Sequence, residues 1–216
     1  MKVVEIFESI DGEGIRVGLP VTFIRLHGCN LRCSYCDSLY ACDGDNYTEM
    51  SIDDILKKVK ELNHKLITLT GGEPLIHPDV QYLIYALSKA GYLINIETNG
   101  AVDIKPVIKK RGMIITLDYK CPSSKMESKM ILDNLTLLRK SDVLKFVVGS
   151  KEDLEKAKEI ISKYELQGKC NIYFSPVFGN IEPREIVEFI LENRLEKVRM
   201  QLQIHKFIWD PDKRGV

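Results

Sequence analysis

The sequence predicts an α/β fold in which six βα units form an incomplete (β/α)6 TIM-like barrel. Short, β-branched apolar runs alternate with amphipathic stretches along the chain, which is typical of parallel strands joined by helices. The runs recur at roughly 25 to 30 residues, enough for one strand and its right-handed crossover. Eight units would close a full barrel, so six leave it open along one side. An open, doubly wound sheet is the alternative architecture.

The strands are predicted where β-branched and apolar residues cluster. They cover 21–26, 65–70, 92–97, 113–118, 143–148 and 170–175, and a last strand is expected at 197–204. The helices between them are predicted at 51–62, about 78–90, 103–110, 127–139, 150–164 and from Pro183 onward. Ser51, with Asp54 three residues later, and Ser150 are typical helix N-caps, and Pro183 suits a first helical turn.

Composition and charge indicate one globular domain spanning 1–216. Of the 216 residues, 44% are apolar and 29% are charged, an ordinary balance for a folded domain. Lys plus Arg and Asp plus Glu number 31 each, so no net field attracts nucleic acid. Lys2, Glu5 and Glu8 interrupt any signal peptide or membrane span at the N-terminus. We therefore expect a cytoplasmic protein that binds neither nucleic acid nor a membrane.

Cys29, Cys33, Cys36 and Cys42 gather in a long loop, 27–50, after the first predicted strand. In a reducing compartment such a group indicates a metal or catalytic site rather than disulfides. Long loops in compact domains are usually functional, and barrel active sites form at the carboxyl ends of the strands. Four thiolates suit a structural zinc ion, whereas three thiolates on a four-iron cluster leave one iron open to a further ligand. The spacing of the cysteines alone does not decide between a zinc ion and an iron–sulfur cluster.

The run CNLRCSYC, with an aromatic residue before its last cysteine, resembles the three-cysteine motif of the radical S-adenosylmethionine (SAM) superfamily. This resemblance implies a partial six-unit barrel and a [4Fe–4S] cluster on Cys29, Cys33 and Cys36, with SAM chelated at the open iron. Cys42 is then surplus, and it is expected to be a plain thiol like Cys121 and Cys170.

Further motifs follow successive predicted strands. In TGGEP at 70–74 the glycines permit close approach of the backbone to a ligand, and in the superfamily this segment binds the SAM amino group. ETNG at 97–100 is suited to a ribose, although an Asn-Gly turn alone also explains it. DYKCPSS places a lysine over the same pocket, where a lone lysine is ordinarily solvated. The expected SAM-binding residues are Tyr35, Cys36, Asp37, Gly72, Glu73, Asn99, Asp118, Tyr119, Lys120 and Ser175.

Segments at both ends of the chain, ESIDGEG, FIRLHGC, KCPSS and QIHK, resemble the 7-carboxy-7-deazaguanine synthase family. The resemblance implies that 6-carboxy-5,6,7,8-tetrahydropterin is converted to 7-carboxy-7-deazaguanine with loss of ammonia, a step towards queuosine. It also implies an external electron donor such as a flavodoxin or ferredoxin, a homodimer, and a segment at about 197–216 that caps the substrate. The expected substrate-binding residues are Ile10, Asp11, Gly12, Glu13, Arg25, Thr70 and His205.

The arginine among them has the bidentate geometry that a pterin carboxylate needs, although Arg25 paired with an acid such as Glu13 is a structural alternative. The family further implies Mg²⁺ bound by the hydroxyl of Ser38, because magnesium prefers oxygen ligands. Ser38 stands where threonine is usual, and Asp11 where glutamine is more frequent.

Two other functions are weighed against this one. A glycyl-radical activating enzyme shares the cysteine motif and a short chain, but the DGEG opening and the QIHK end argue against it. A module that only holds a cluster or zinc leaves TGGEP and ETNG unexplained.

Overall fold

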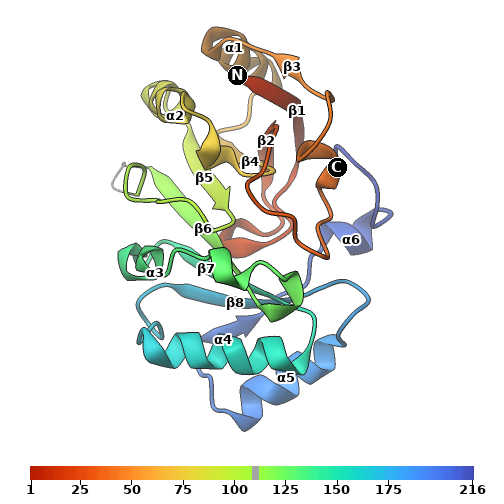
Figure 1. Cartoon of the computed structure of the whole chain (residues 1–216). Helices are drawn as coiled ribbons and strands as arrows, with labels where there is room; N and C mark the ends of the chain where they lie inside the picture. The colour runs from red at the N-terminus through yellow and green to blue at the C-terminus, as the bar shows by residue number, and fades with distance from the viewer. Residues whose placement is uncertain (109–111) are drawn as a thin grey trace.

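The computed structural model describes residues 1–108 and 112–216 and shows one nine-stranded sheet over them (Figure 1). The strands are β1 Lys2–Ile10, β2 Pro20–Leu26, β3 Thr48–Glu49, β4 Leu66–Gly71, β5 Leu93–Thr98, β6 Met113–Lys120, β7 Val143–Val148, β8 Asn171–Pro176 and β9 Val198–Met200. The helices are α1 Ile52–Leu62, α2 Val80–Lys89, α3 Asp133–Leu137, α4 Lys151–Lys163, α5 Pro183–Glu192 and α6 His205–Ile208.

The strand order β3-β1-β2-β4-β5-β6-β7-β8-β9 confirms an open α/β barrel rather than a doubly wound sheet. From β2 to β9 every neighbouring pair is parallel, and the order follows the sequence with no switch point. Because all these strands run the same way, their carboxyl ends meet at one edge. The long loop 27–50 leaves β2 at that edge.

The N-terminal strand β1 was not expected. It pairs antiparallel with β2 over most of its length and with the short β3 on its other side. Its side chains are mostly half-buried, so the charges at Lys2, Glu5 and Glu8 sit on an edge region where they reach solvent or a partner. The antiparallel pairing sets Ile10 opposite Pro20, so the segment after β1 begins at the amino end of β2, the opposite edge from the carboxyl strand ends.

Three helical or strand predictions need correction. The helix expected at 127–139 is reduced to a 3-10 turn at Glu127–Lys129 and the short α3, because Met130 and Leu138 adopt extended backbone. The last strand ends at Met200, and the remainder of 197–204 leaves the sheet. In the helix expected at 103–110, residues 109 and 110 lie outside the described part, and 103–108 contain only a turn in which Ile108 N donates to Ile104 O.

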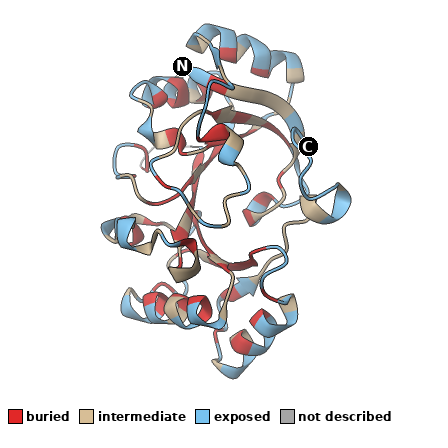
Figure 2. Ribbon diagram, turned by 45° about the vertical axis from the view of Figure 1, so that its right-hand side comes forward, coloured by how far each residue is buried: buried red, intermediate tan, exposed pale blue. Residues whose placement is uncertain are grey.

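The core lies between the sheet and the inner faces of its helices, and Figure 2 shows buried residues along both. In α1, Ile55 and Val59 are fully buried. The helix begins with the predicted capping box of Ser51 and Asp54, whose groups exchange hydrogen bonds. No helix among the described residues is long and apolar enough to cross a membrane.

Candidate active site

The strand ends surround a cavity of about 640 Å³. Its wall comes from the loop 27–50, the ends of β1, β2 and β4 to β7, and the segment that follows β9. In Figure 1 the blue α6 lies beside the orange loop, and the Lys206 ammonium lies 3.5 Å from the Asp37 carboxylate across this junction. A second hollow, on α4, is lined by alternating Glu and Lys of that one helix and is a solvated helix face.

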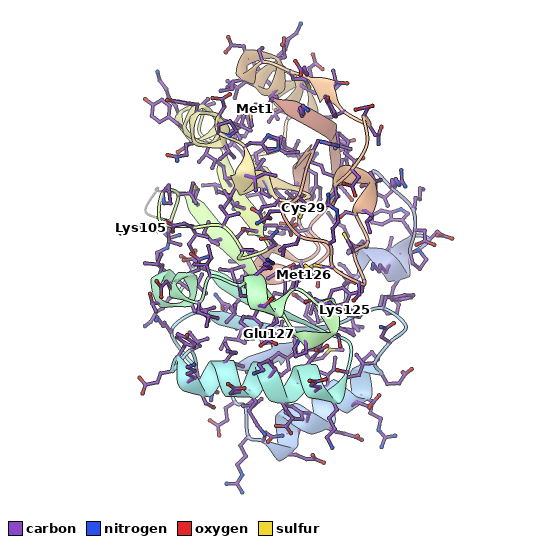
Figure 3. The ribbon with its side chains drawn as sticks, viewed as in Figure 1. Met1, Cys29, Lys105, Lys125, Met126 and Glu127 are labelled. Carbon is purple, nitrogen blue, oxygen red and sulfur yellow. The ribbon has the colours of Figure 1, made fainter. Side chains whose placement is uncertain are left out.

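The three expected cluster ligands, Cys29, Cys33 and Cys36, all line the cavity. Figure 3 shows Cys29 near the centre of the molecule, where the loop meets the strand ends. Its Sγ accepts hydrogen bonds from Leu31 N at 3.4 Å and from Asn99 Nδ2 at 3.6 Å. Such bonds favour a thiolate, the form that binds iron.

The thiols differ in acidity. A hydrogen bond from Cys42 is the largest cause that lowers the pKa values of Cys29 and Cys36, each to about 6. Burial raises the pKa of Cys33. Among the described residues, no group of three or more His, Cys, Asp or Glu side chains is arranged to hold a single metal ion. The donor set and its shared cavity fit the [4Fe–4S] cluster that three cysteines of this spacing imply.

The TGGEP segment packs directly on the loop that holds the cysteines. Gly72 N donates to Leu26 O at 3.2 Å, and Glu73 N donates to Gly28 O at 2.8 Å. A Cβ on Gly72 would lie 2.3 Å from Gly28 O and 2.8 Å from Cys29 Cβ. Glycine is therefore required here by close approach of two backbones.

The Glu73 side chain joins two motifs instead of lining the cavity. Its carboxylate accepts hydrogen bonds from Leu75 N, Thr98 Oγ1 and Asn99 N at 3.0, 2.9 and 2.6 Å. Burial raises its pKa to about 7, against these hydrogen bonds, which favour the charged form. The residue thus fixes ETNG relative to TGGEP.

A buried network of charges forms the floor of the cavity. Lys145, 7% exposed, lies with its Nζ 3.0 Å from Glu13 Oε2 and 3.2 Å from Asp118 Oδ1. The Lys120 ammonium lies 3.1 Å from the other oxygen of Asp118, and the Glu13 carboxylate also accepts from Ser175 Oγ and from Gln203 Nε2.

The network keeps its carboxylates ionised. Desolvation acts to raise the pKa of Glu13, but the Lys145 charge and the bonds from Ser175 and Gln203 outweigh it, so the pKa lies below its usual range. Burial also acts to raise the pKa of Asp118, but the charges of Lys120 and Lys145 outweigh this effect, so the pKa of Asp118 is lowered as well. Four charged side chains, which are between 8% and 20% exposed, are thereby held in place at the floor of the cavity.

Arg25 lines the cavity but pairs with a different acid from the one considered. Its Nε donates to Glu5 Oε1 at 2.7 Å, and Tyr40 OH donates to the same oxygen at 2.8 Å. Glu13 is instead engaged by Lys145. The hydrogen bond from Nε to Glu5, on one edge of the guanidinium, orients the Arg25 side chain at the cavity wall.

Most of the other predicted residues reach the cavity, and three do not. Ile10, Gly12, Glu13, Thr70 and His205 line it, as do Tyr35, Asp37, Ser38, Gly72, Asn99, Asp118 and Lys120. Tyr119 points to the opposite face of β6 from its neighbours, as strand alternation requires, and its OH donates to Glu127. Asp11 is turned away to accept a bond from Thr68 Oγ1 at 2.7 Å. Ser175 lies behind Glu13.

Sequence reasoning missed Glu97 and Lys145. Both line the cavity, and Thr70 Oγ1 donates to Glu97 Oε2 at 2.9 Å. Each is the single charged residue of its strand, LINIET in β5 and VLKFVV in β7. Because an unpaired charge is almost never buried, that pattern alone predicts a partner or a polar site.

We expect Glu97→Gln to remove part of the pH dependence of stability. Burial raises the pKa of Glu97 to about 7, whereas in the unfolded chain a glutamate ionises near about 4.3. Between these values the folded chain binds more protons, so stability falls as pH rises through the window. We expect the wild type to lose about 1–2 kcal/mol relative to the variant across it, less than the full shift implies because the side chain borders the cavity. Urea unfolding of both proteins at about pH 5 and about pH 8 measures this effect. If the difference in unfolding free energy between wild type and variant is the same at both pH values, the prediction is wrong.

The chain is similar to proteins of one superfamily over most of its length. The family model of the Radical SAM superfamily matches residues 23–192. The protein named 7-carboxy-7-deazaguanine synthase in Clostridium acetobutylicum is 49% identical, over 100% of this chain and 99% of the relative. A protein of the same name in Chlorobaculum tepidum is 41% identical over 100% and 97%.

Solved structures agree on the fold. The crystal structure of QueE from Escherichia coli superposes with a TM-score of 0.77 at 23% identity and covers 93% of this chain and 92% of that one. Streptococcus suis SuiB bound to S-adenosylmethionine superposes with a TM-score of 0.58 at 13% identity, over 84% and 46%. The match to the family model and the identity to relatives over their full length show that the chain belongs to the 7-carboxy-7-deazaguanine synthase family of the Radical SAM superfamily.

Proposed function

We propose that this chain converts 6-carboxy-5,6,7,8-tetrahydropterin to 7-carboxy-7-deazaguanine, with release of ammonia, as a step towards queuosine. The single cavity that joins the three cysteines to Arg25 and Glu13 carries this proposal, together with the names of the full-length relatives. A glycyl-radical activating enzyme acts on a protein backbone, and the relatives give that alternative no support.

In this proposal Cys29, Cys33 and Cys36 would hold the cluster, and residues at the strand ends that line the same cavity would bind SAM. When bound, this cofactor pair supplies one-electron cleavage of SAM, which starts hydrogen abstraction at the substrate. Asn99 and Lys120 border the cavity beside the cysteines and provide an amide and a cation for the ribose and carboxylate of SAM. The remaining SAM contacts come from Tyr35, Cys36, Asp37, Gly72 and Asp118.

The substrate lies between the cysteines and the charged floor. Arg25, oriented by Glu5 and Tyr40, binds the pterin carboxylate. The amino-pyrimidinone edge of the pterin has neighbouring N–H groups, which donate hydrogen bonds to the carboxylates of Glu13 and Glu97. Ile10 and Gly12 pack on the ring, while Thr70 and His205 complete the pocket.

Several finer properties belong to the same proposal. Mg²⁺ would bind the Ser38 hydroxyl, whose Oγ lies 4.0 Å from Cys36 Sγ at the cavity wall, and waters and the substrate would supply its other oxygen ligands. A flavodoxin or ferredoxin supplies the electron. The working form is a cytoplasmic homodimer that feeds tRNA modification.

Anaerobic turnover tests the function. The reconstituted chain, given dithionite, SAM and 6-carboxytetrahydropterin, should form 7-carboxy-7-deazaguanine by mass spectrometry, faster with Mg²⁺ than without it. Cys33→Ala should abolish the product, whereas Cys170→Ala, a buried thiol remote from the cavity, should retain it. Cleavage of SAM while the pterin stays intact would leave the cofactor assignment standing and contradict the substrate.

A further inference from the structure

The segment 211–216, which follows α6, forms part of the cavity wall, and each of its residues lines the cavity. In Figure 1 the C-terminus lies beside the orange part of the loop 27–50. Lys213 N donates to Asp210 O at 2.9 Å, so the chain makes a closed turn after α6. The next residue after this turn is Arg214, which no sequence motif singled out.

Arg214 lies over the ring of Tyr40, which belongs to the loop that holds the cysteines. The guanidinium carbon of Arg214 lies 4.0 Å from the ring centroid, a distance at which a cation is attracted to the face of a tyrosine. The guanidinium carbon of Arg25 lies 5.8 Å from the same centroid. All three side chains line the cavity. One aromatic ring thus brings together two guanidinium groups that are far apart in sequence.

The charges around the Tyr40 ring do not balance. Glu5 is the carboxylate there, and its Oε1 accepts hydrogen bonds from Arg25 Nε at 2.7 Å and from Tyr40 OH at 2.8 Å. Arg214 contacts the ring, and no carboxylate of the described residues forms an ion pair with it. Two guanidinium groups and one carboxylate leave one positive charge without a partner. This part of the wall is therefore suited to a carboxylate, which matches the planar fork of a guanidinium.

Resting on the substrate named in the proposed function, we propose that Arg214 is a second cation for the carboxylate of the pterin, and that Tyr40 is the positioning residue that holds it near Arg25. Glu5 occupies the Nε position of the Arg25 guanidinium, which leaves the terminal nitrogens of that group for the substrate. A second guanidinium lets the same carboxylate accept hydrogen bonds from two residues. Arg214 therefore determines specificity, because it favours a pterin with a carboxylate over one without it.

Isothermal titration calorimetry tests this inference on the cluster-loaded protein with SAM, kept anaerobic and without reductant so that no turnover occurs. Two ligands are compared, 6-carboxy-5,6,7,8-tetrahydropterin and tetrahydropterin that lacks the carboxylate. In Arg214→Gln the Kd of the carboxylated ligand should rise about tenfold, whereas the Kd of the other ligand should change by less than about twofold. Arg214→Lys keeps the charge and should recover part of the affinity.

Two further variants test the role of Tyr40 and the general effect of losing an arginine. Tyr40→Leu removes the ring beneath Arg214, so in that background Arg214→Gln should raise the Kd of the carboxylated ligand by clearly less than it does in the wild type. Arg184→Gln is the matched control. Its side chain, on α5, is 87% exposed and pairs with Glu188, and its loss should leave both Kd values unchanged.

Three results would overturn the inference. An unchanged Kd of the carboxylated ligand in Arg214→Gln means that this guanidinium does not bind the carboxylate. An equal loss of affinity for both ligands means that the segment 211–216 only covers the pocket. An undiminished effect of Arg214→Gln in the Tyr40→Leu background means that Tyr40 does not position Arg214. The wild type is measured first, and if it binds neither ligand the proposed substrate is wrong and the inference with it, so the two failures are distinguishable.

Discussion

Lys145→Met should destabilise the protein by about 3–5 kcal/mol and lower kcat/KM by about 100-fold or more. Lys145 is the shared cation of Glu13 and Asp118, and methionine fills the space but leaves both carboxylates buried without it. An uncompensated buried charge is costly, so Glu13 would take up a proton instead, while Asp118 would keep Lys120 as its one remaining cation. Glu13 would then no longer present a charged acceptor to the cavity.

The pH dependence separates this cause from a simple packing defect. In the wild type the pKa values of Glu13 and Asp118 are lowered, so their ion pairs stabilise the fold above about pH 4.3 and lose that contribution as the pH falls. In the variant these pKa values rise. The difference in unfolding free energy between wild type and variant should therefore narrow as the pH falls from about 7 to about 4, measured by urea titration.

Lys156→Met is the matched control. Lys156 pairs with Glu127 and Glu159 on the outer face of α4 and is partly exposed. The same change of side chain there should alter stability by less than about 0.5 kcal/mol and leave turnover unchanged. If Lys145→Met unfolds at the same urea concentration as the wild type at pH 7, the network contributes nothing to the fold.

The elements predicted best are those whose signals are local. α1 was predictable because its cap and its apolar face lie within one short segment, and the buried strands β4 to β8 because each contains a cluster of β-branched and apolar residues. The end of the last strand was not, since it depends on contacts far away in sequence. Beyond Met200, Gln201 exchanges hydrogen bonds with the backbone of Gly14, and Gln203 donates to Glu13. Gln201 N still donates to Phe174 O, and the side-chain bonds of Gln201 and Gln203 then join the chain to the segment 13–14.

The part of the site that consists of short sequence motifs was predictable. The cysteine run and TGGEP are short and specific, and the structure brings both to one cavity. The place of Tyr119 was readable from strand alternation, since Asp118 and Lys120 claim the other face of β6. The partner of Arg25 was not readable, because Glu5 comes opposite it only through the antiparallel pairing of β1 with β2.

Gly72→Ala should abolish cluster binding while leaving most of the fold intact. The added Cβ would lie 2.3 Å from Gly28 O and 2.7 Å from Gly28 C, and backbone atoms cannot rotate away as a flexible side chain does. The loop that holds Cys29 must move outward, which separates its sulfur from those of Cys33 and Cys36. We expect reconstituted iron to fall to a small fraction of wild type, turnover to be lost, and stability to drop by about 1–3 kcal/mol.

Gly149→Ala supplies the comparison, because a Cβ there meets its nearest atom, Val177 Cγ2, at 3.3 Å, and the other two neighbours lie at 3.6 Å. That variant should bind wild-type iron, measured by colorimetric assay after anaerobic reconstitution. The contrast isolates close approach from the general loss of a glycine, since neither position has a left-handed backbone. If Gly72→Ala keeps its full iron content, the loop is not fixed by TGGEP, and its position must depend on its own hydrogen bond from Gly28 N to Ala41 O.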